Sequence, residues 1–212
     1  MTNSIAIFCG SALGSDQIFS ETARQVGHTI AEQGKTLVYG GGRSGLMGIV
    51  ADSALEAGGQ VIGVIPHVLV DRELAHQGLT ELHVVKDMQE RKLKMSALSD
   101  GFIAMPGGAG TLEEIFEQWT WAQLGIHLKP NAFLNVNGFY DDLLKFLKMT
   151  TDKGFTHARF TDSLIVSDSV KAILKRMDQF QAPEPKWGMV DPELLDVLSL
   201  IHISEPTRQE AI

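Results

Sequence analysis

Glycine-rich runs follow three short apolar segments of the chain. These runs are Gly10-Ser11, Gly40-Gly41-Gly42-Arg43-Ser44-Gly45 and Pro106-Gly107-Gly108-Ala109-Gly110-Thr111. Glycine lets a backbone approach an anion closely, and the start of a following helix offers free N–H groups and the positive end of a dipole. Three such turns at one edge of a sheet would form an amide-lined floor of the size of a nucleotide.

A basic pair could act beside such a floor. Arg91 shares a helical apolar stripe with Met88, Met95 and Leu98. A cation on that stripe needs an anionic partner or a ligand, because burying an unpaired charge is prohibitive. A salt bridge to a neighbouring helix is the alternative interpretation. Lys92 borders the same stripe and could extend to solvent.

Two acidic residues follow the third glycine run. Glu114 could steady positive charge or orient a water molecule beside a bound phosphate, and Glu113 precedes it. The structural alternative is a capping box, in which Thr111 caps a helix and Glu114 reaches back from the third helical position. The residues themselves leave both interpretations of Glu114 open.

Other chemistries have weaker support. Gly40, Gly42 and Gly45 satisfy G-x-G-x-x-G, but the next apolar segment ends in Pro66-His67 and lacks the acidic residue that would hold a ribose hydroxyl of a dinucleotide. The histidines show no metal-ligand spacing. The single cysteine ends an apolar run without a nearby histidine pattern, so we expect a small core residue rather than a nucleophile.

Alternating short apolar and longer amphipathic segments would position these residues. We expect strands at 4–9, 36–40, 60–65, 82–85, 101–105, 132–136 and 163–167, and helices at 16–33, 45–58, 87–99, 112–125, 139–153 and 168–180. The strands are continuously apolar, which is typical of parallel strands buried on both faces. The pattern predicts an α/β fold, a doubly wound, mainly parallel and Rossmann-like sheet of about seven strands with helices on both faces.

Composition narrows the function classes. The 212 residues are 44% hydrophobic, which disfavours general disorder, and 18 basic against 26 acidic residues give a net charge of −8. Such a chain is a poor candidate for binding nucleic acid or anionic membranes. The N-terminus lacks a basic region of the signal-peptide type, and no apolar stretch approaches a membrane span. We therefore expect a soluble protein of the cytoplasm.

The sequence divides into one large domain and two short C-terminal segments. We expect a single Rossmann-like domain at 1–181 and a Pro-rich C-terminal extension at 182–197. The stretch 198–212, LSLIHISEPTRQEAI, fits no βα unit and resembles the translation of a sequencing adapter, so we expect a non-native or disordered tail. An ordinary frayed tail is the alternative, and we assign the stretch no function.

Four motifs resemble one family. The run 106–114, PGGAGTLEE, matches the PGGxGTxxE motif of the LOG family, the cytokinin riboside 5′-monophosphate phosphoribohydrolases. The run 40–48, GGGRSGLMG, is similar to its GGGxxGLMG segment. Arg91 and Lys92 stand where the family has its RK pair, and 119–127, WTWAQLGIH, resembles the following helix. The resemblance spans roughly residues 4–180.

The resemblance implies hydrolysis of the N-glycosidic bond of a purine nucleoside 5′-monophosphate, either AMP or N6-prenylated AMP, without a metal or redox cofactor. It implies that Arg91 and Glu114 are catalytic. Residues expected to bind substrate are Gly10, Ser11, Gly41, Gly42, Gly45, Met47, Glu73, Lys92, Gly107, Gly108, Ala109, Gly110, Thr111, Leu112, Glu113 and Thr120. Proteins of this type have also been labelled lysine decarboxylases, but the chain is too short for a separate domain that binds pyridoxal phosphate.

Two other functions compete with hydrolysis. One is a carrier that resembles the molybdenum-cofactor carrier proteins and uses similar glycine loops without a reaction; the other is a nicotinamide-dependent oxidoreductase. The pair of Arg91 and Glu114 favours hydrolysis, because a carrier needs no carboxylate at a sugar. We also expect a homodimer, since Met88, Met95, Phe116 and Trp119 suggest more apolar surface than one sheet face needs.

Overall fold

Seven strands and seven α-helices alternate along the chain in the computed structural model, which describes residues 2–70 and 75–189. The strands are β1 (Ser4–Phe8), β2 (Thr36–Tyr39), β3 (Val61–Pro66), β4 (Glu81–Val85), β5 (Gly101–Ala104), β6 (Asn131–Leu134) and β7 (Ile165–Ser167). The helices are α1 (Gln17–Glu32), α2 (Gly45–Glu56), α3 (Met88–Leu98), α4 (Ala109–Leu124), α5 (Asp141–Asp152), α6 (Ala158–Asp162) and α7 (Val170–Asp178). Short 3₁₀ turns, η1 (His67–Leu69) and η2 (Val136–Gly138), follow β3 and β6.

All seven strands pair in parallel in the order β4-β3-β2-β1-β5-β6-β7. The chain winds outward from β1 to β4, then returns to the other side of β1 with β5 and winds outward again. The order therefore reverses between β1 and β5, and this is where an open parallel sheet forms its ligand-binding crevice. The predicted doubly wound α/β fold is confirmed.

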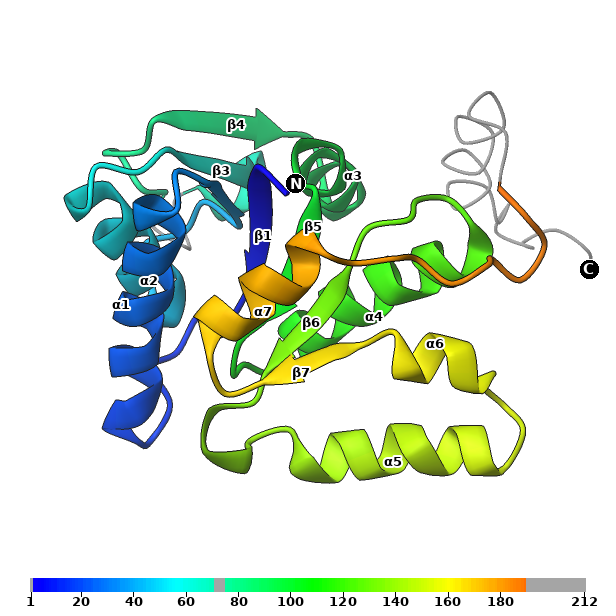
Figure 1. The fold of residues 1–212 in the computed structure, drawn as a ribbon. Coiled ribbons are helices and arrows are strands. Elements are labelled where there is room, and N and C mark those ends of the chain that lie inside the picture. The colour runs from blue at the N-terminus through cyan, green and yellow to red at the C-terminus, as the bar shows by residue number, and fades with distance from the viewer. Residues whose placement is uncertain (1, 71–74, 190–212) are drawn as a thin grey trace, which may run out of the picture.

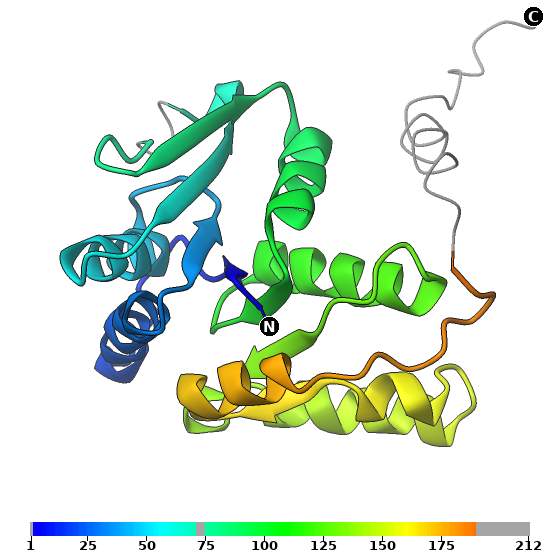
Figure 2. The ribbon, with the colours of Figure 1, turned by 45° about the horizontal axis from the view of Figure 1, so that its top comes forward.

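Helices cover both faces of the sheet, as Figure 1 shows. On one face lie α1, α2 and α7, and α1 and α2 pack side by side. On the other face lie α3 and α4, followed by α5 and α6. Figure 2 shows α3 and α4 next to each other on that second face. Both faces of the central strands are thus removed from water.

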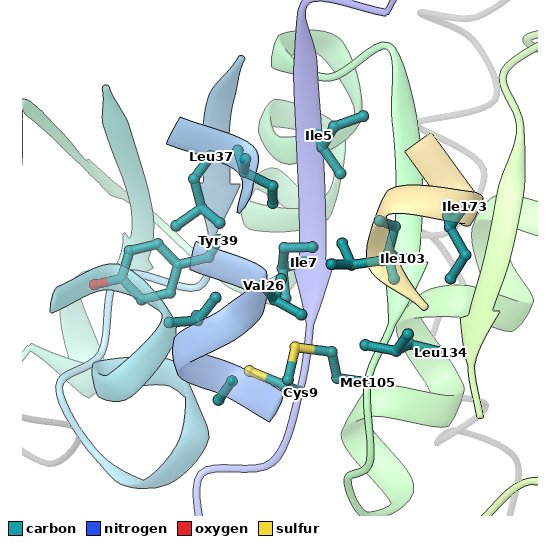
Figure 3. Close-up of a cluster of buried hydrophobic side chains, with 14 of the residues drawn as sticks. Ile5, Ile7, Cys9, Val26, Leu37, Tyr39, Ile103, Met105, Leu134 and Ile173 are labelled. Carbon is teal, nitrogen blue, oxygen red and sulfur yellow. The ribbon is translucent and has the colours of Figure 1, made fainter. Parts of the chain in front are cut away.

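Successive side chains of β1 show why the strand sequence is continuously apolar. Ile5 and Ile7 point toward α1 and α7, where Figure 3 shows them beside Val26 and Ile173. Ala6 and Phe8 belong to the cluster on the opposite face. Since neighbouring residues of a strand point to opposite sides, a sheet covered on both faces needs apolar residues at every position.

The expected element boundaries agree with the structure to within two residues, with one exception. Helix α4 begins at Ala109, three residues before the expected start at 112. Helix α6 and both 3₁₀ turns were not predicted, because segments of three to five residues are too short to show a helical pattern of apolar residues. Of the extension, residues 182–189 run past the end of α4, where the Lys186 N–H donates to the Gln123 carbonyl (2.8 Å). The tail 198–212 lies outside the described residues.

The apolar surface expected on α3 and α4 is mostly internal, so that interpretation was wrong. Met95 is buried in the core under α3, and Trp119 is buried under α4. Phe116 packs edge-on against Trp119, with ring centroids 5.8 Å apart. Of the four residues only Met88 is exposed. Within the described ranges, no helix has the length and apolar character that crossing a membrane requires.

Candidate functional site

The three glycine runs meet at the carboxyl edge of the sheet, beside the point where the strand order reverses. The Gly10 N–H donates to the Pro106 carbonyl (3.1 Å), which joins the first run to the third. The Leu46 N–H donates to the Gly10 carbonyl (3.1 Å), which joins the second run to the first. The structure therefore brings together the three turns that the sequence singles out.

Gly45 shows why glycine is needed at this meeting point. Its φ of +59° lies in the left-handed region, and a Cβ there would lie 2.3 Å from the carbonyl carbon of Ser11. Any larger residue would push the first and second runs apart, in addition to straining its own backbone. Gly45 thus keeps two loops in backbone contact beside the pocket.

A pocket of about 350 Å³ opens over this junction. Ten residues that the sequence predicts for the site line it: Gly10, Ser11, Met47, Arg91, Gly108, Ala109, Gly110, Thr111, Glu113 and Glu114. Cys9, Leu69 and Met88 also line it and were not predicted. Cys9 directly follows β1, and Met88 lies one helical turn before Arg91, so strand ends and helix periodicity could have indicated both.

The first turn of α4 forms one wall of the pocket. Its N-cap is Gly108, which provides no side-chain cap, and Thr111 lies in the first turn as a buried residue. The capping box of Thr111 and Glu114, which was the structural alternative for Glu114, is therefore wrong, since the helix begins before both. The first N–H groups of a helix lack carbonyl partners within the helix, and at Ala109 and Gly110 they lie at the pocket. This arrangement suits an anion.

Arg91 reaches the pocket from α3. It is only 5% exposed, in agreement with the predicted apolar stripe. Its Nε donates to the Val64 carbonyl (3.1 Å) and its Nη2 donates to the Gly40 carbonyl (2.8 Å). These two carbonyls, in β3 and just after β2, fix the plane of the guanidinium. A fixed cation in a pocket is suited to bind phosphate or sugar oxygens.

Glu114 lies on the same pocket wall and influences Cys9. Burial and, to a smaller extent, the Glu114 carboxylate raise the pKa of the Cys9 thiol far above its ordinary value. The thiol therefore stays protonated at neutral pH, and a protonated thiol is a poor nucleophile. Glu114 is thus the stronger candidate for chemistry at the base of the pocket.

Lys92 is tied to α4 by two carboxylates. Its Nζ is 2.9 Å from Oε1 of Glu117 and is also hydrogen-bonded to Glu113. Burial lowers the pKa of Lys92, but these hydrogen bonds outweigh burial and hold the pKa above its ordinary value. Lys92 is not among the residues that line the pocket, whereas Glu113 is. Sequence reasoning missed Glu117, although its spacing of four from Glu113 places both on one helix face.

Several predicted residues that the structure describes do not line this pocket. Gly41 and Gly42 are buried in the second run, and Leu112 packs against the core. Thr120 is exposed on α4, nine residues and roughly 13 Å along the helix from Thr111. Glu73 lies outside the described residues.

A second pocket of about 310 Å³ adjoins the first. It shares Gly10, Ser11 and Gly108 with the first pocket, and it also includes the predicted residue Gly107. Its other walls are largely apolar and include Phe19 and Phe139, whose rings meet edge-on with centroids 5.7 Å apart. Charge is therefore concentrated in the first pocket, which we take as the candidate active site.

Curated relatives match most of the chain. It is 41% identical over 191 residues to the probable cytokinin riboside 5′-monophosphate phosphoribohydrolase LOGL1 of Oryza sativa subsp. japonica, covering 87% of this chain and 86% of that protein. It is 40% identical over 191 residues to LOG7 of Arabidopsis thaliana, which carries the same enzyme name, covering 90% and 87%. The chain belongs to the LOG family.

Solved structures support the fold of this LOG-family chain. The molybdenum-cofactor carrier protein of Chlamydomonas reinhardtii superposes with a TM-score of 0.64, covering 84% of this chain and 97% of that one, at 21% identity. The protein TM1055 superposes with a TM-score of 0.65 at 22% identity, covering 84% and 99%. At this level of identity the likeness concerns the fold alone.

A family model described as "Possible lysine decarboxylase" matches residues 47–177 of this LOG-family chain. Amino-acid decarboxylation with pyridoxal phosphate uses a lysine that forms a Schiff base with the cofactor. The described residues that line the pocket include no lysine, and nearby Lys92 is held by two carboxylates. The side chains of the site therefore do not fit that chemistry.

Proposed function

We propose that the protein hydrolyses the N-glycosidic bond of purine nucleoside 5′-monophosphates and releases the free base and ribose 5-phosphate. The main support is that buried Arg91, the carboxylate of Glu114 and the start of α4 line one pocket. The chain that forms this pocket is about 40% identical to curated phosphoribohydrolases. A carrier of the same fold would need a phosphate floor but no carboxylate at the sugar.

The phosphate would bind at the first turn of α4. The N–H groups of Ala109 and Gly110 and the hydroxyl of Thr111 can donate to its oxygens. Arg91 would bind the phosphate or the ribose hydroxyls and so position the sugar. Its hydrogen bonds to Val64 and Gly40 fix this orientation before substrate arrives.

Glu114 would act at the anomeric carbon. As the bond from C1′ to the purine nitrogen breaks, its electron pair leaves with the base and the ribose gains oxocarbenium-like positive charge. A carboxylate stabilises that charge and can accept a hydrogen bond from the attacking water. The oxygen of the water then bonds to C1′, one of its protons is released, and the base nitrogen acquires a proton.

The substrates we propose are AMP and N6-prenylated AMP. The first pocket combines its charged residues with the side chains of Met47, Leu69 and Met88, against which a purine can pack. We further propose that the protein works as a homodimer in the cytoplasm. The dimer is supported by Met88 and Leu93, which leave apolar surface exposed on α3 beside the site. The cytoplasm is supported by Cys9, a buried free thiol, which suits a reducing compartment.

The test is direct identification of products. The protein is incubated with AMP, isopentenyl-AMP and the corresponding nucleosides, and the free base and the sugar phosphate are separated by chromatography. We expect adenine and ribose 5-phosphate in equal amounts from AMP. Tight binding of the nucleotides with no free base would instead indicate a carrier.

A further inference from the structure

His76 is a buried histidine outside the candidate pocket. It is 5% exposed, and its Nε2 lies 2.8 Å from Oδ1 of Asp52 on α2. The Gly78 N–H donates to its Nδ1 (3.0 Å). Because Nδ1 accepts, the neutral ring carries its proton on Nε2 and donates it to Asp52. Nδ1 therefore orders the local turn at Gly78, and Nε2 joins this turn to Asp52, which is 24 residues away in sequence.

The backbone around His76 packs against the second glycine run. The His76 N–H donates to the Gly41 carbonyl (3.0 Å), and Ala75 forms an isolated antiparallel bridge with Gly42. The preceding residue of the run is Gly40, whose carbonyl accepts the hydrogen bond from Arg91 Nη2. The histidine turn therefore supports the backbone that orients the guanidinium.

The second run is held from both ends. Helix α2 begins at Gly45, the last residue of the run, and Asp52 lies two turns into that helix. The His76–Asp52 contact thus joins the helix that leaves the run to the turn that packs on it. Loss of the imidazole would free this turn, and Gly41 with it, while the core clusters on both sheet faces stay packed.

We propose that His76, held by Asp52, is a positioning residue that acts through Gly40 and Arg91. The inference rests on the proposed function of Arg91. It adds that His76, which does not touch substrate, helps to hold Arg91 in its orientation. A merely structural histidine would affect stability alone. A positioning histidine affects the same step as Arg91, and its effect disappears once Arg91 is impaired.

A double-mutant cycle of His76→Ala and Arg91→Lys tests this difference. We expect His76→Ala to lower kcat/KM for AMP by about tenfold or more, chiefly through kcat, since small misplacements at a site are costly. In the Arg91→Lys background the same change is expected to cost less than about twofold. His76→Gln, whose amide can still donate to Asp52, is expected to retain most of the parental kcat/KM. It replaces His76→Ala in the cycle if that variant does not fold.

The control is His127→Ala. His127 is also buried, and its Nδ1 also accepts the N–H two residues on, from Lys129 (3.2 Å), but it follows the end of α4 opposite the pocket. Additive losses in the cycle, or an equal loss in His127→Ala, would overturn the positioning role. The same cycle is measured on the dissociation constant of ribose 5-phosphate by calorimetry. If the parent protein hydrolyses no nucleotide, the proposed function is wrong. The binding cycle still tests His76 in that case: non-additive effects of the two substitutions support the positioning role, and additive effects contradict it.

Discussion

The Nη2 atom of Arg91 donates a hydrogen bond to the carbonyl oxygen of Gly40 over 2.8 Å, across 51 residues of sequence. A Cβ at residue 40 would lie 2.0 Å from that same nitrogen. Glycine at this position is therefore required by the approach of the guanidinium and not by its own backbone angles. The contact joins α3 to the second glycine run and determines where the positive charge stands.

Gly40→Ala is expected to displace the guanidinium with little other change. The clash involves the end of a flexible side chain, so we expect a loss of about 1–2 kcal/mol in unfolding free energy, as for mild overpacking. Activity is expected to fall by about 10², because the cation no longer stands at the sugar or phosphate. The measurements are AMP hydrolysis and denaturant unfolding.

Gly101→Ala is the matched control for that substitution. It adds a methyl to another buried glycine, at the start of β5, 3.2 Å from Cγ of Pro130. We expect a cost in stability and an unchanged kcat/KM. Equal activity losses in both variants would show that crowding of the sheet, rather than displacement of Arg91, explains the effect of Gly40→Ala.

Substrate phosphate is expected to dominate selectivity. Two or more charge-assisted hydrogen bonds to a phosphate at the first turn of α4 correspond to at least about 10² in kcat/KM of AMP over adenosine. The binding energy of the phosphate is used to orient the sugar. The comparison requires initial rates on both compounds, and equal rates would rule out the phosphate cradle.

Stability is expected to decrease as the pH falls through the range below 6.5, in part because of His127. Burial, and in second place Lys129, lower the pKa of His127 to about 3. Between about pH 3 and 6.5 the unfolded chain binds a proton that the folded chain does not, so acidification favours unfolding. At pH 5 this corresponds to about 2 kcal/mol at most.

Denaturant unfolding of the parent and of His127→Asn at pH 7.5 and pH 5 tests that expectation. The asparagine oxygen can still accept from the Lys129 N–H, as His127 Nδ1 does over 3.2 Å. We expect the parent to lose more stability than the variant between the two pH values. An equal loss in both proteins would mean that His127 does not contribute.

The mass in solution is expected to be that of a dimer. Leu93 is an exposed apolar residue on α3, so Leu93→Lys is expected to shift the mass toward the monomer, since a charge at an apolar interface is costly. Phe155→Lys, beyond the end of α5, is the control and should leave the mass unchanged. Light scattering that gives a monomer at micromolar concentration for the parent would contradict the dimer.

The fold could be predicted from the sequence because its signals are local. The central strands of a sheet covered on both faces are buried on both sides, so β1, β2, β3 and β5 are each almost continuously apolar. The start of α4 was misplaced because Thr111 and Glu114 match a capping box, whereas Gly108 caps the helix through its backbone. The exposure of Met95 and Trp119 was misjudged because the order of the strands determines what packs beneath each helix.

The candidate site was predictable to the extent that parallel strands bring their carboxyl ends to one edge. That geometry is sufficient to gather the three glycine runs. The partners of Arg91 were not predictable, because Val64 and Gly40 are 27 and 51 residues away and contribute backbone carbonyls, which carry no residue-type signal. The partner of His76 was not predictable for a different reason: Asp52 is a side chain on another element, 24 residues away, and no local pattern connects the two.

The most direct test of the central claim is the comparison of Glu114→Gln with the parent. Gly108 caps α4, so the amide should leave the helix start unchanged and cost at most about 1 kcal/mol in stability. A neutral amide cannot stabilise an oxocarbenium-like charge, so we expect AMP hydrolysis to fall by about 10²–10³. Thermal unfolding and adenine release are measured on the same preparations. A stable, inactive variant is the result we predict, and near-parental activity would contradict the assignment of Glu114.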